Sequence, residues 1–197
     1  MKSLLPIFQL DLVLLPGEEV ELHIFEDRFK ALFKDLGTEF AVGGIVRSAR
    51  ENNVRYGTTF ELIETLNTYQ TGESDVLIRG VDFFEIQSEI TEEGDYRYPV
   101  AEVEVFETSL TDEVPTELLP LANEVLKVAS SNENRAWSPV IYLQEIFVHL
   151  QLSSDLKEEF LQSIIDENWK EFLDGQMQLF VLIQQQMKQL KGNFLLN

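Results

Sequence analysis

The chain has 197 residues, with 35 acidic and 15 basic side chains, a formal charge of −20, two histidines and no cysteine. This composition excludes a disulfide framework, a thiolate nucleophile and a cysteine metal site, and we expect no cofactor and no bound metal. A surface this acidic repels phosphate, which disfavours nucleic acid as a partner.

The chain before about residue 110 has the pattern of a β structure. Apolar and polar residues alternate at 20–24 and at 101–105, which is the period of half-buried strands. Further apolar runs predict strands at 40–46, 58–66, 75–79 and 83–90, with turns at Gly57, Gly72, Gly80 and Gly94. Between 25 and 36 the period is helical, with an apolar stripe that ends before Gly37 and consists of Phe25, Phe29, Leu32, Phe33 and Leu36. We therefore predict a small barrel-like sheet with an inserted helix.

After Pro115 the period is helical throughout. The apolar stripes predict one helix at 118–129, a second that begins at Ser138–Pro139, and a third from Ser154–Asp155 to Leu173. Asp174–Gly175 is expected to break the chain before a last helix. Because isolated helices of this length are marginal in water, we expect a helical bundle. The predicted class is α+β, with a β subdomain at 1–110 and an α-helical subdomain at 111–197.

Candidate catalytic groups are few. Adjacent carboxylates such as Glu18–Glu19 diverge on a strand or helix, which is poor geometry for acid–base catalysis. No glycine-rich phosphate loop occurs, and no serine or cysteine nucleophile in a strained turn accompanies His23. A hydrogen-bonded structural histidine is the favoured interpretation. A small-ligand or enzyme pocket lined by His23, Glu26 and Arg28 is the alternative.

The aromatic residues are dominated by 14 phenylalanines, of which Phe83 and Phe84 are adjacent. Neighbours on a strand face opposite sides, so one ring cannot enter the core of a barrel. That ring either packs under the helical half or joins an exposed apolar patch, and large patches of this kind mark contact surfaces.

No segment has the pattern of a targeting signal or of a membrane anchor. Pro6, Gln9 and Asp11 interrupt the first apolar run before it could form a signal peptide. The uncharged stretch from Gly175 to Met187 contains five glutamines and is too short to span a bilayer. We therefore expect a cytoplasmic protein that has no membrane partner.

Two linked motifs lie near the N-terminus, LPIFQLDLVLLPGE at 5–18 and LHIFEDRF at 22–29. Their order and spacing resemble the opening of the N-terminal substrate-binding domain of Lon proteases. The segments 75–80 and 98–104 are similar to later strands of that family, the first leading to a glycine turn. Ten positions carry the resemblance, and we expect them to shape the fold: Pro6, Phe8, Pro16, Gly17, His23, Phe25, Glu26, Arg28, Phe29 and Gly80.

The resemblance implies a PUA-like barrel followed by helices and a role in recognising polypeptide substrates or a protein partner. The ATPase and Ser–Lys protease modules of a complete Lon protease are absent from the sequence, so we expect a stand-alone, non-catalytic protein. RNA binding by a PUA-like barrel is an alternative that the net charge of −13 over residues 1–107 opposes. The candidate polypeptide contacts are aromatic: Phe83, Phe84, Phe106, Trp137 and Tyr142.

Overall fold

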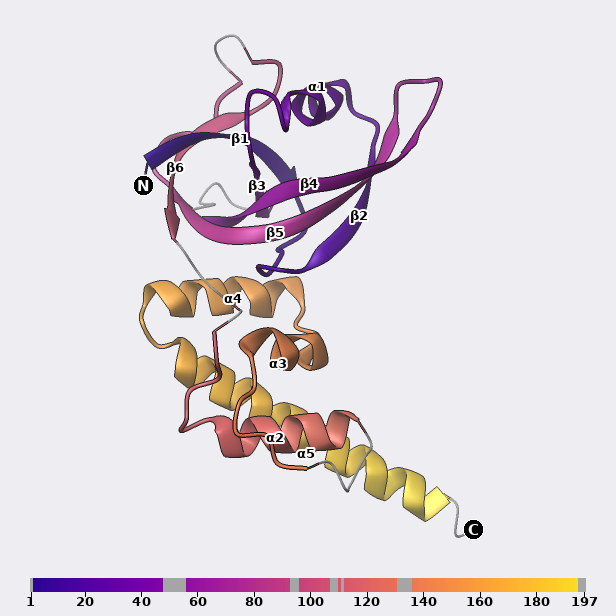
Figure 1. Cartoon of the computed structure of the whole chain (residues 1–197), viewed down its shortest axis with the longest axis vertical. Helices are drawn as coiled ribbons and strands as arrows, with labels where there is room; N and C mark the ends of the chain where they lie inside the picture. Colours follow the sequence, from indigo (N-terminus) through magenta and orange to yellow (C-terminus); the bar gives the residue numbers. More distant parts are fainter. Residues whose placement is uncertain are drawn as a thin grey trace. The chain divides into compact units, whose positions relative to one another are not determined.

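The computed structural model describes residues 2–47, 56–92, 96–106, 110, 112–130 and 136–194, with the backbone alone at 191–194. The chain divides into two compact units, Met1–Ser109 and Leu110–Asn197. Within the described residues, the first unit holds six strands and one helix, and the second holds four helices (Figure 1). The chain is thus a mixed α+β protein, as its sequence predicts.

The strands of the first unit form one sheet in the order β2-β5-β4-β3-β1-β6. Their bounds are β1 Lys2–Leu10, β2 Glu19–Ile24, β3 Gly43–Arg47, β4 Tyr56–Thr68, β5 Ser74–Ile86 and β6 Val100–Phe106. β1 pairs with β3 in parallel, and the other pairs are antiparallel. Because β6 pairs with both β1 and β5, five strands make a closed ring of pairings.

Buried side chains of this unit form two clusters on opposite faces of β1. Phe8 belongs to the larger cluster, whereas Leu5 and Ile7 belong to the smaller one, as the two-residue period of a strand requires. The helix α1 (Asp27–Asp35) covers the larger cluster with Phe29, Leu32 and Phe33. The Phe29 ring meets Phe8 edge-on, with 4.2 Å between ring centroids.

Gly80 lies inside a strand rather than at the predicted turn. The strands expected at 75–79 and 83–90 form the single strand β5, which continues through Gly80. Gly80 exchanges backbone hydrogen bonds with the preceding turn, since Gly17 N–H donates to Gly80 O at 2.8 Å and Gly80 N–H donates to Glu18 O at 2.9 Å. A Cβ at Gly80 would lie 2.5 Å from Leu15 O. The glycine therefore makes room for another backbone. Gly57 likewise lies within β4, and Gly94 falls outside the described residues.

The helices of the second unit are α2 (Leu119–Ala129), α3 (Leu143–Leu150), α4 (Ser154–Ile165) and α5 (Trp169–Phe194). The helix start predicted at Ser138–Pro139 is wrong, because α3 begins five residues after Ser138, at Leu143. Ser138 N–H donates instead to Asn123 Oδ1 of α2 at 2.7 Å. The N-terminus of α3 is closed by Glu145, whose Oε1 accepts from Tyr142 N–H at 3.0 Å.

The predicted break at Asp174–Gly175 is also wrong. The chain breaks between α4 and α5, where Glu167 has a positive φ of 58°, and α5 continues through Gly175. One exposed glycine costs a helix only about 1 kcal/mol. Burial of Leu173, Met177 and Val181 on both sides of it offsets that cost.

Candidate functional site

The first half of the family-like motif builds the turn that docks on Gly80. Pro6 and Phe8 are buried in β1, and Pro16 is buried where the chain leaves toward β2. Gly17 has a φ of +85°, which favours glycine, and Glu18 N–H donates to Leu15 O at 3.0 Å to close the turn. These residues position backbone and core, and none of them presents a reactive group.

The second half of the motif exposes aromatic rings. His23, Phe25 and Tyr69, which we call the ring cluster, are exposed on β2 and beside it. The ring centroids of His23 and Phe25 are 6.2 Å apart in a stacked arrangement, and those of His23 and Tyr69 are 5.8 Å apart edge-on. Phe25 is 59% exposed and precedes α1, so it does not belong to the helical stripe that the sequence predicted.

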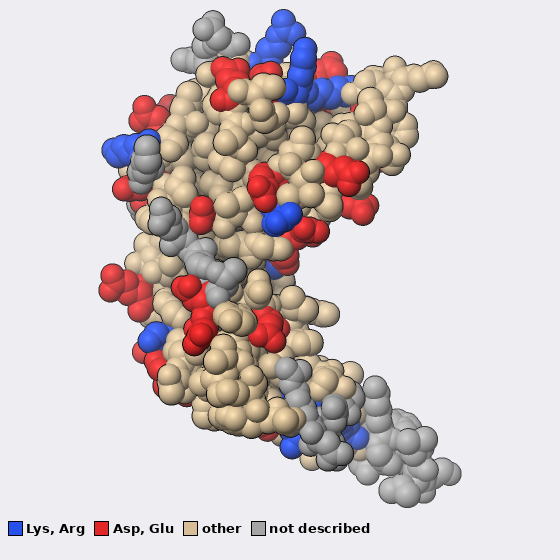
Figure 2. Space-filling model, viewed as in Figure 1, with Lys and Arg blue, Asp and Glu red and all other residues tan. Residues whose placement is uncertain are grey.

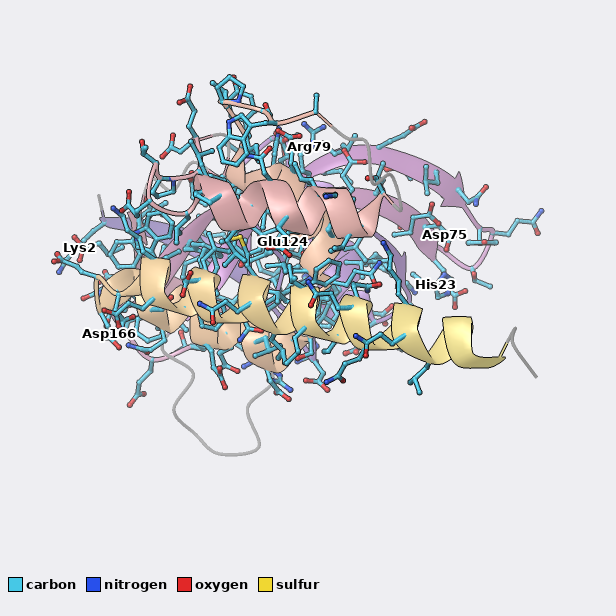
Figure 3. The ribbon with its side chains drawn as sticks, turned by 90° about the horizontal axis from the view of Figure 1, so that it is seen from below. Lys2, His23, Asp75, Arg79, Glu124 and Asp166 are labelled. Carbon is cyan, nitrogen blue, oxygen red and sulfur yellow. The ribbon has the colours of Figure 1, made fainter. Side chains whose placement is uncertain are left out.

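Asp75 on β5 holds the ring cluster together, and it lies beside His23 (Figure 3). Its Oδ1 is 2.7 Å from His23 Nδ1, and its Oδ2 accepts from Tyr69 OH at 2.6 Å and from Asn67 Nδ2 at 3.0 Å. These hydrogen bonds, led by that of Tyr69, lower the pKa of Asp75 to about 2. The same bond raises the pKa of Tyr69. The carboxylate thus stays ionised and fixes two exposed rings.

The structure does not join His23 to Glu26 and Arg28. Both ring nitrogens of His23 face carboxylates, because Nε2 lies 3.7 Å from Glu73 Oε2. Arg28 Nε donates to Glu26 Oε2 at 2.9 Å, and the Arg28 guanidinium carbon lies 4.4 Å from the centre of the Phe29 ring. Within the described residues, no hydroxyl is hydrogen-bonded to His23, so the geometry prepares no nucleophile.

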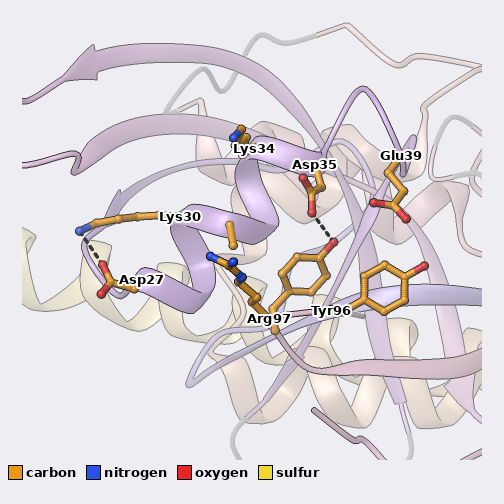
Figure 4. A pocket seen from close by; sticks show the side chains of 9 residues that line it. Asp27, Lys30, Lys34, Asp35, Glu39, Tyr96 and Arg97 are labelled. Atoms are coloured by element: carbon orange, nitrogen blue, oxygen red, sulfur yellow. Dashed lines mark hydrogen bonds and ion pairs between the residues drawn. The ribbon is translucent and has the colours of Figure 1, made fainter. Parts of the chain in front are cut away.

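A pocket of about 540 Å³ lies along α1. We call it the α1 pocket (Figure 4). Its lining contains neither His23 nor Arg28. The residues come from one face of α1, from Glu39 after that helix and from the segment before β6: Asp27, Lys30, Ala31, Lys34, Asp35, Glu39, Tyr96, Arg97 and Tyr98. Tyr98 OH donates to Asp35 Oδ2 at 2.8 Å. Burial and that carboxylate raise the pKa of Tyr98, so its hydroxyl remains a donor at neutral pH.

The aromatic residues expected to contact polypeptide differ in exposure. Phe83 and Phe84 are 1% and 0% exposed, and Phe84 packs in the smaller cluster. Neither ring is available at the surface of this structure. Phe106 is half-buried, whereas Trp137 and Tyr142 are 60% and 42% exposed.

Among the residues whose side chains the structure describes, the largest run of exposed apolar side chains lies on α5, where the sequence analysis named no contact residues. We call it the α5 ridge, and its members are 45% to 60% exposed: Leu179, Leu182, Ile183, Met187 and Leu190. Their spacing places them on one face of the helix. The signal was present in the sequence as the uncharged stretch from Gly175 to Met187, which combines apolar residues with glutamine.

Acidic side chains are spread over the visible face of the molecule, whereas Lys and Arg gather over α1 (Figure 2).

Among the described residues, no group of His, Asp and Glu side chains is arranged to hold a metal ion. No described helix is both long enough and apolar enough to cross a membrane.

No protein-family model and no curated protein matches the sequence. Among solved structures, the chain is similar to the Lon N-terminal domain protein from Xanthomonas campestris, with 26% identity and a TM-score of 0.60 over 81% of this chain and 90% of that one. It is also similar to the N-terminal domain of the Mycobacterium avium complex Lon protease, with 16% identity and a TM-score of 0.53 over 93% of this chain and 98% of that one. The second likeness is one of fold alone.

Proposed function

We propose that this chain, a domain of the Lon N-terminal type, recognises polypeptide segments or a protein partner and catalyses no reaction on them. The likeness in fold and sequence to the Xanthomonas campestris protein supports this proposal. Fold alone does not assign a function, so the argument depends on surfaces that this chain itself presents.

The α5 ridge is the observation that carries the proposal. Large aliphatic side chains at this exposure leave apolar area in contact with water, and covering such area stabilises a complex by roughly 25 cal/mol per Å². The helix around the ridge is uncharged from Gly175 to Met187, although the chain has a net charge of −20. An apolar segment can therefore dock there with little desolvation of charge. Exposed Trp137 and Tyr142 are proposed as further contacts in the same unit.

The non-catalytic part of the proposal rests on His23. A catalytic histidine needs one ring nitrogen directed at a nucleophile or substrate, with the other oriented by a carboxylate. Here Asp75 occupies one nitrogen and Glu73 faces the other.

For the barrel, we propose that the closed ring of strand pairings is of the PUA-like type, used to present surfaces and not to bind RNA. The net charge of −13 over residues 1–107 supports this use.

The proposal is tested by fluorescence anisotropy with a labelled, permanently unfolded model polypeptide. The variant Leu182→Ser/Ile183→Ser removes two residues of the α5 ridge and should weaken binding at least about tenfold. The control Leu4→Ser/Val148→Ser removes two other exposed apolar residues, at 43% and 70% exposure, and should leave the affinity unchanged.

Two results would contradict the proposal. Flat titrations of the unaltered protein across peptides of varied hydrophobicity would exclude polypeptide recognition. An equal loss of affinity in both double variants would exclude the α5 ridge as the contact surface. Circular dichroism melting of each variant checks that it is folded. We expect changes in stability of only about 0.5 kcal/mol, because the substituted side chains lie at the surface.

A further inference from the structure

The α1 pocket is lined by three basic and three acidic side chains, on a chain whose net charge is −20. Three basic side chains line it, Lys30 and Lys34 from α1 and Arg97 from the segment before β6. The lining residues of α1 fall at positions 27, 30, 31, 34 and 35, which is one face of the helix, opposite to the face buried on the sheet. At about 540 Å³, the pocket has the size of a small-ligand site.

Pairing within the pocket leaves two of these cations available. Lys30 Nζ donates to Asp27 Oδ1 at 3.2 Å, and Asp35 accepts the Tyr98 hydroxyl at 2.8 Å. Lys34 and Arg97 have no ion pair with any residue that the structure describes. Figure 4 shows both on one side of the Asp35–Tyr98 hydrogen bond, and Glu39 on the other side. Glu39 is thus apart from these two cations, whereas Asp27 lies on their side of that bond and is paired with Lys30.

We infer that the α1 pocket binds a carboxylate group between Lys34 and Arg97. The planar guanidinium of Arg97 can donate two parallel hydrogen bonds to a carboxylate, and the Lys34 ammonium adds a second charge. The walls offered to the rest of the ligand are Ala31 and the ring of Tyr96, so its body should be apolar or planar. This site is separate from the polypeptide surface proposed on α5 and does not depend on it.

A carboxylate fits this lining better than a phosphate does. Asp27, Asp35 and Glu39 also line the pocket, and they repel a dianion more strongly than a monoanionic group. A carboxylate could come from an acidic polypeptide side chain or from a small free acid. The two sources share the same contacts with Lys34 and Arg97, and separate arms of one experiment distinguish them.

The first arm uses the small dicarboxylate glutarate and inorganic phosphate as probes, with amide NMR of the ¹⁵N-labelled protein at constant ionic strength. Glutarate should shift the amides of Ala31, Lys34 and Arg97 saturably, and phosphate should bind more weakly. Lys34→Gln/Arg97→Gln should weaken glutarate binding at least about fivefold. The control Lys2→Gln/Lys127→Gln removes the same charge at two exposed sites outside the pocket and should leave the binding unchanged.

The second arm compares two labelled peptides that differ only by Glu in place of Gln. If polypeptide supplies the carboxylate, the Glu peptide binds the unaltered protein about three- to tenfold more tightly, and Lys34→Gln/Arg97→Gln removes the difference. If glutarate binds and the peptides bind equally, the pocket takes a small free acid. Absence of saturable shifts with glutarate together with equal peptide affinities overturns the inference, and so does phosphate binding that equals or exceeds glutarate binding. The α5 ridge double variant should leave the glutarate titration unchanged, which separates this outcome from failure of the proposed function.

Discussion

The helices α1 and α5 carry similar apolar stripes but bury them to different extents. The nine-residue α1 buries Phe29, Leu32 and Phe33 to 8% exposure or less against the sheet. In the 26-residue α5, Leu173 and Met177 are fully buried, but the residues of the ridge beyond them remain 45% to 60% exposed. Periodicity therefore reports that a helix has an apolar face, whereas the elements packed opposite decide whether that face is structural or available for contact.

The largest expected effect sharpens this comparison through one substitution in each helix. Phe29→Ala should lower the free energy of unfolding by about 3 to 5 kcal/mol, because it empties a site that Phe8 contacts edge-on. Leu182→Ala in the α5 ridge should change it by no more than about 0.5 kcal/mol, since the side chain is half exposed. Urea unfolding followed by circular dichroism measures both. A loss above about 2 kcal/mol for Leu182→Ala would mean that the ridge is covered in solution.

Two glycines extend the contrast between covered and open positions. Gly80→Ala should destabilise the protein by about 1 to 3 kcal/mol, because the new Cβ meets the Leu15 carbonyl oxygen at 2.5 Å. Gly175→Ala in α5 should stabilise it by about 0.5 to 1 kcal/mol, because nothing lies within 4 Å of its Cβ and alanine favours the helix. Thermal melting of the two variants should show shifts of opposite sign. Shifts of the same sign would contradict the placement of one of the two residues.

These glycines also show how far sequence reasoning reached. Local periodicity correctly predicted a mixture of strands and helices, because burial on one face of an element imposes that periodicity. It misread Gly80 as a turn, because the need for glycine there comes from Leu15, 65 positions earlier in the chain. It also misread Gly175 as the end of a helix. For Phe83 and Phe84, the sequence left open whether the second ring is covered or exposed, and both rings are buried.

The site residues were harder to predict than the fold for the same physical reason. The motif residues were found because they are contiguous in the sequence, and most of them build the turn and the core. The α1 pocket joins Lys34 to Arg97, which are 63 positions apart and belong to no local pattern. The α5 ridge was visible as an uncharged stretch, but its exposure depends on the packing of the whole second unit.

A smaller effect concerns how α1 is tied to the segment before β6. Tyr98→Phe removes the hydrogen bond to Asp35 and should lower the free energy of unfolding by about 1 kcal/mol. Burial raises the pKa of Tyr98 in the folded state, with Asp35 contributing in the same direction. The folded state then binds more protons above pH ~10, so stability should fall as pH rises beyond that value. Denaturant unfolding at several alkaline pH values should show a smaller fall for Tyr98→Phe.

The smallest effect tests whether the exposed ring cluster is held as firmly as the buried face of α1. The pKa of Asp75 is about 2 in the folded protein, below its usual range near 3.9, so its contribution to stability is present above that range and is lost as pH falls from about 4 to about 2. Carboxyl ¹³C NMR should follow the titration directly. Tyr69→Phe should raise this pKa most, because the Tyr69 hydrogen bond is the largest cause of the shift, and Asn67→Ala should raise it less. A pKa of Asp75 that is unchanged in Tyr69→Phe would mean that the hydroxyl does not engage the carboxylate in solution. The Tyr69 ring would then be exposed without being held by Asp75.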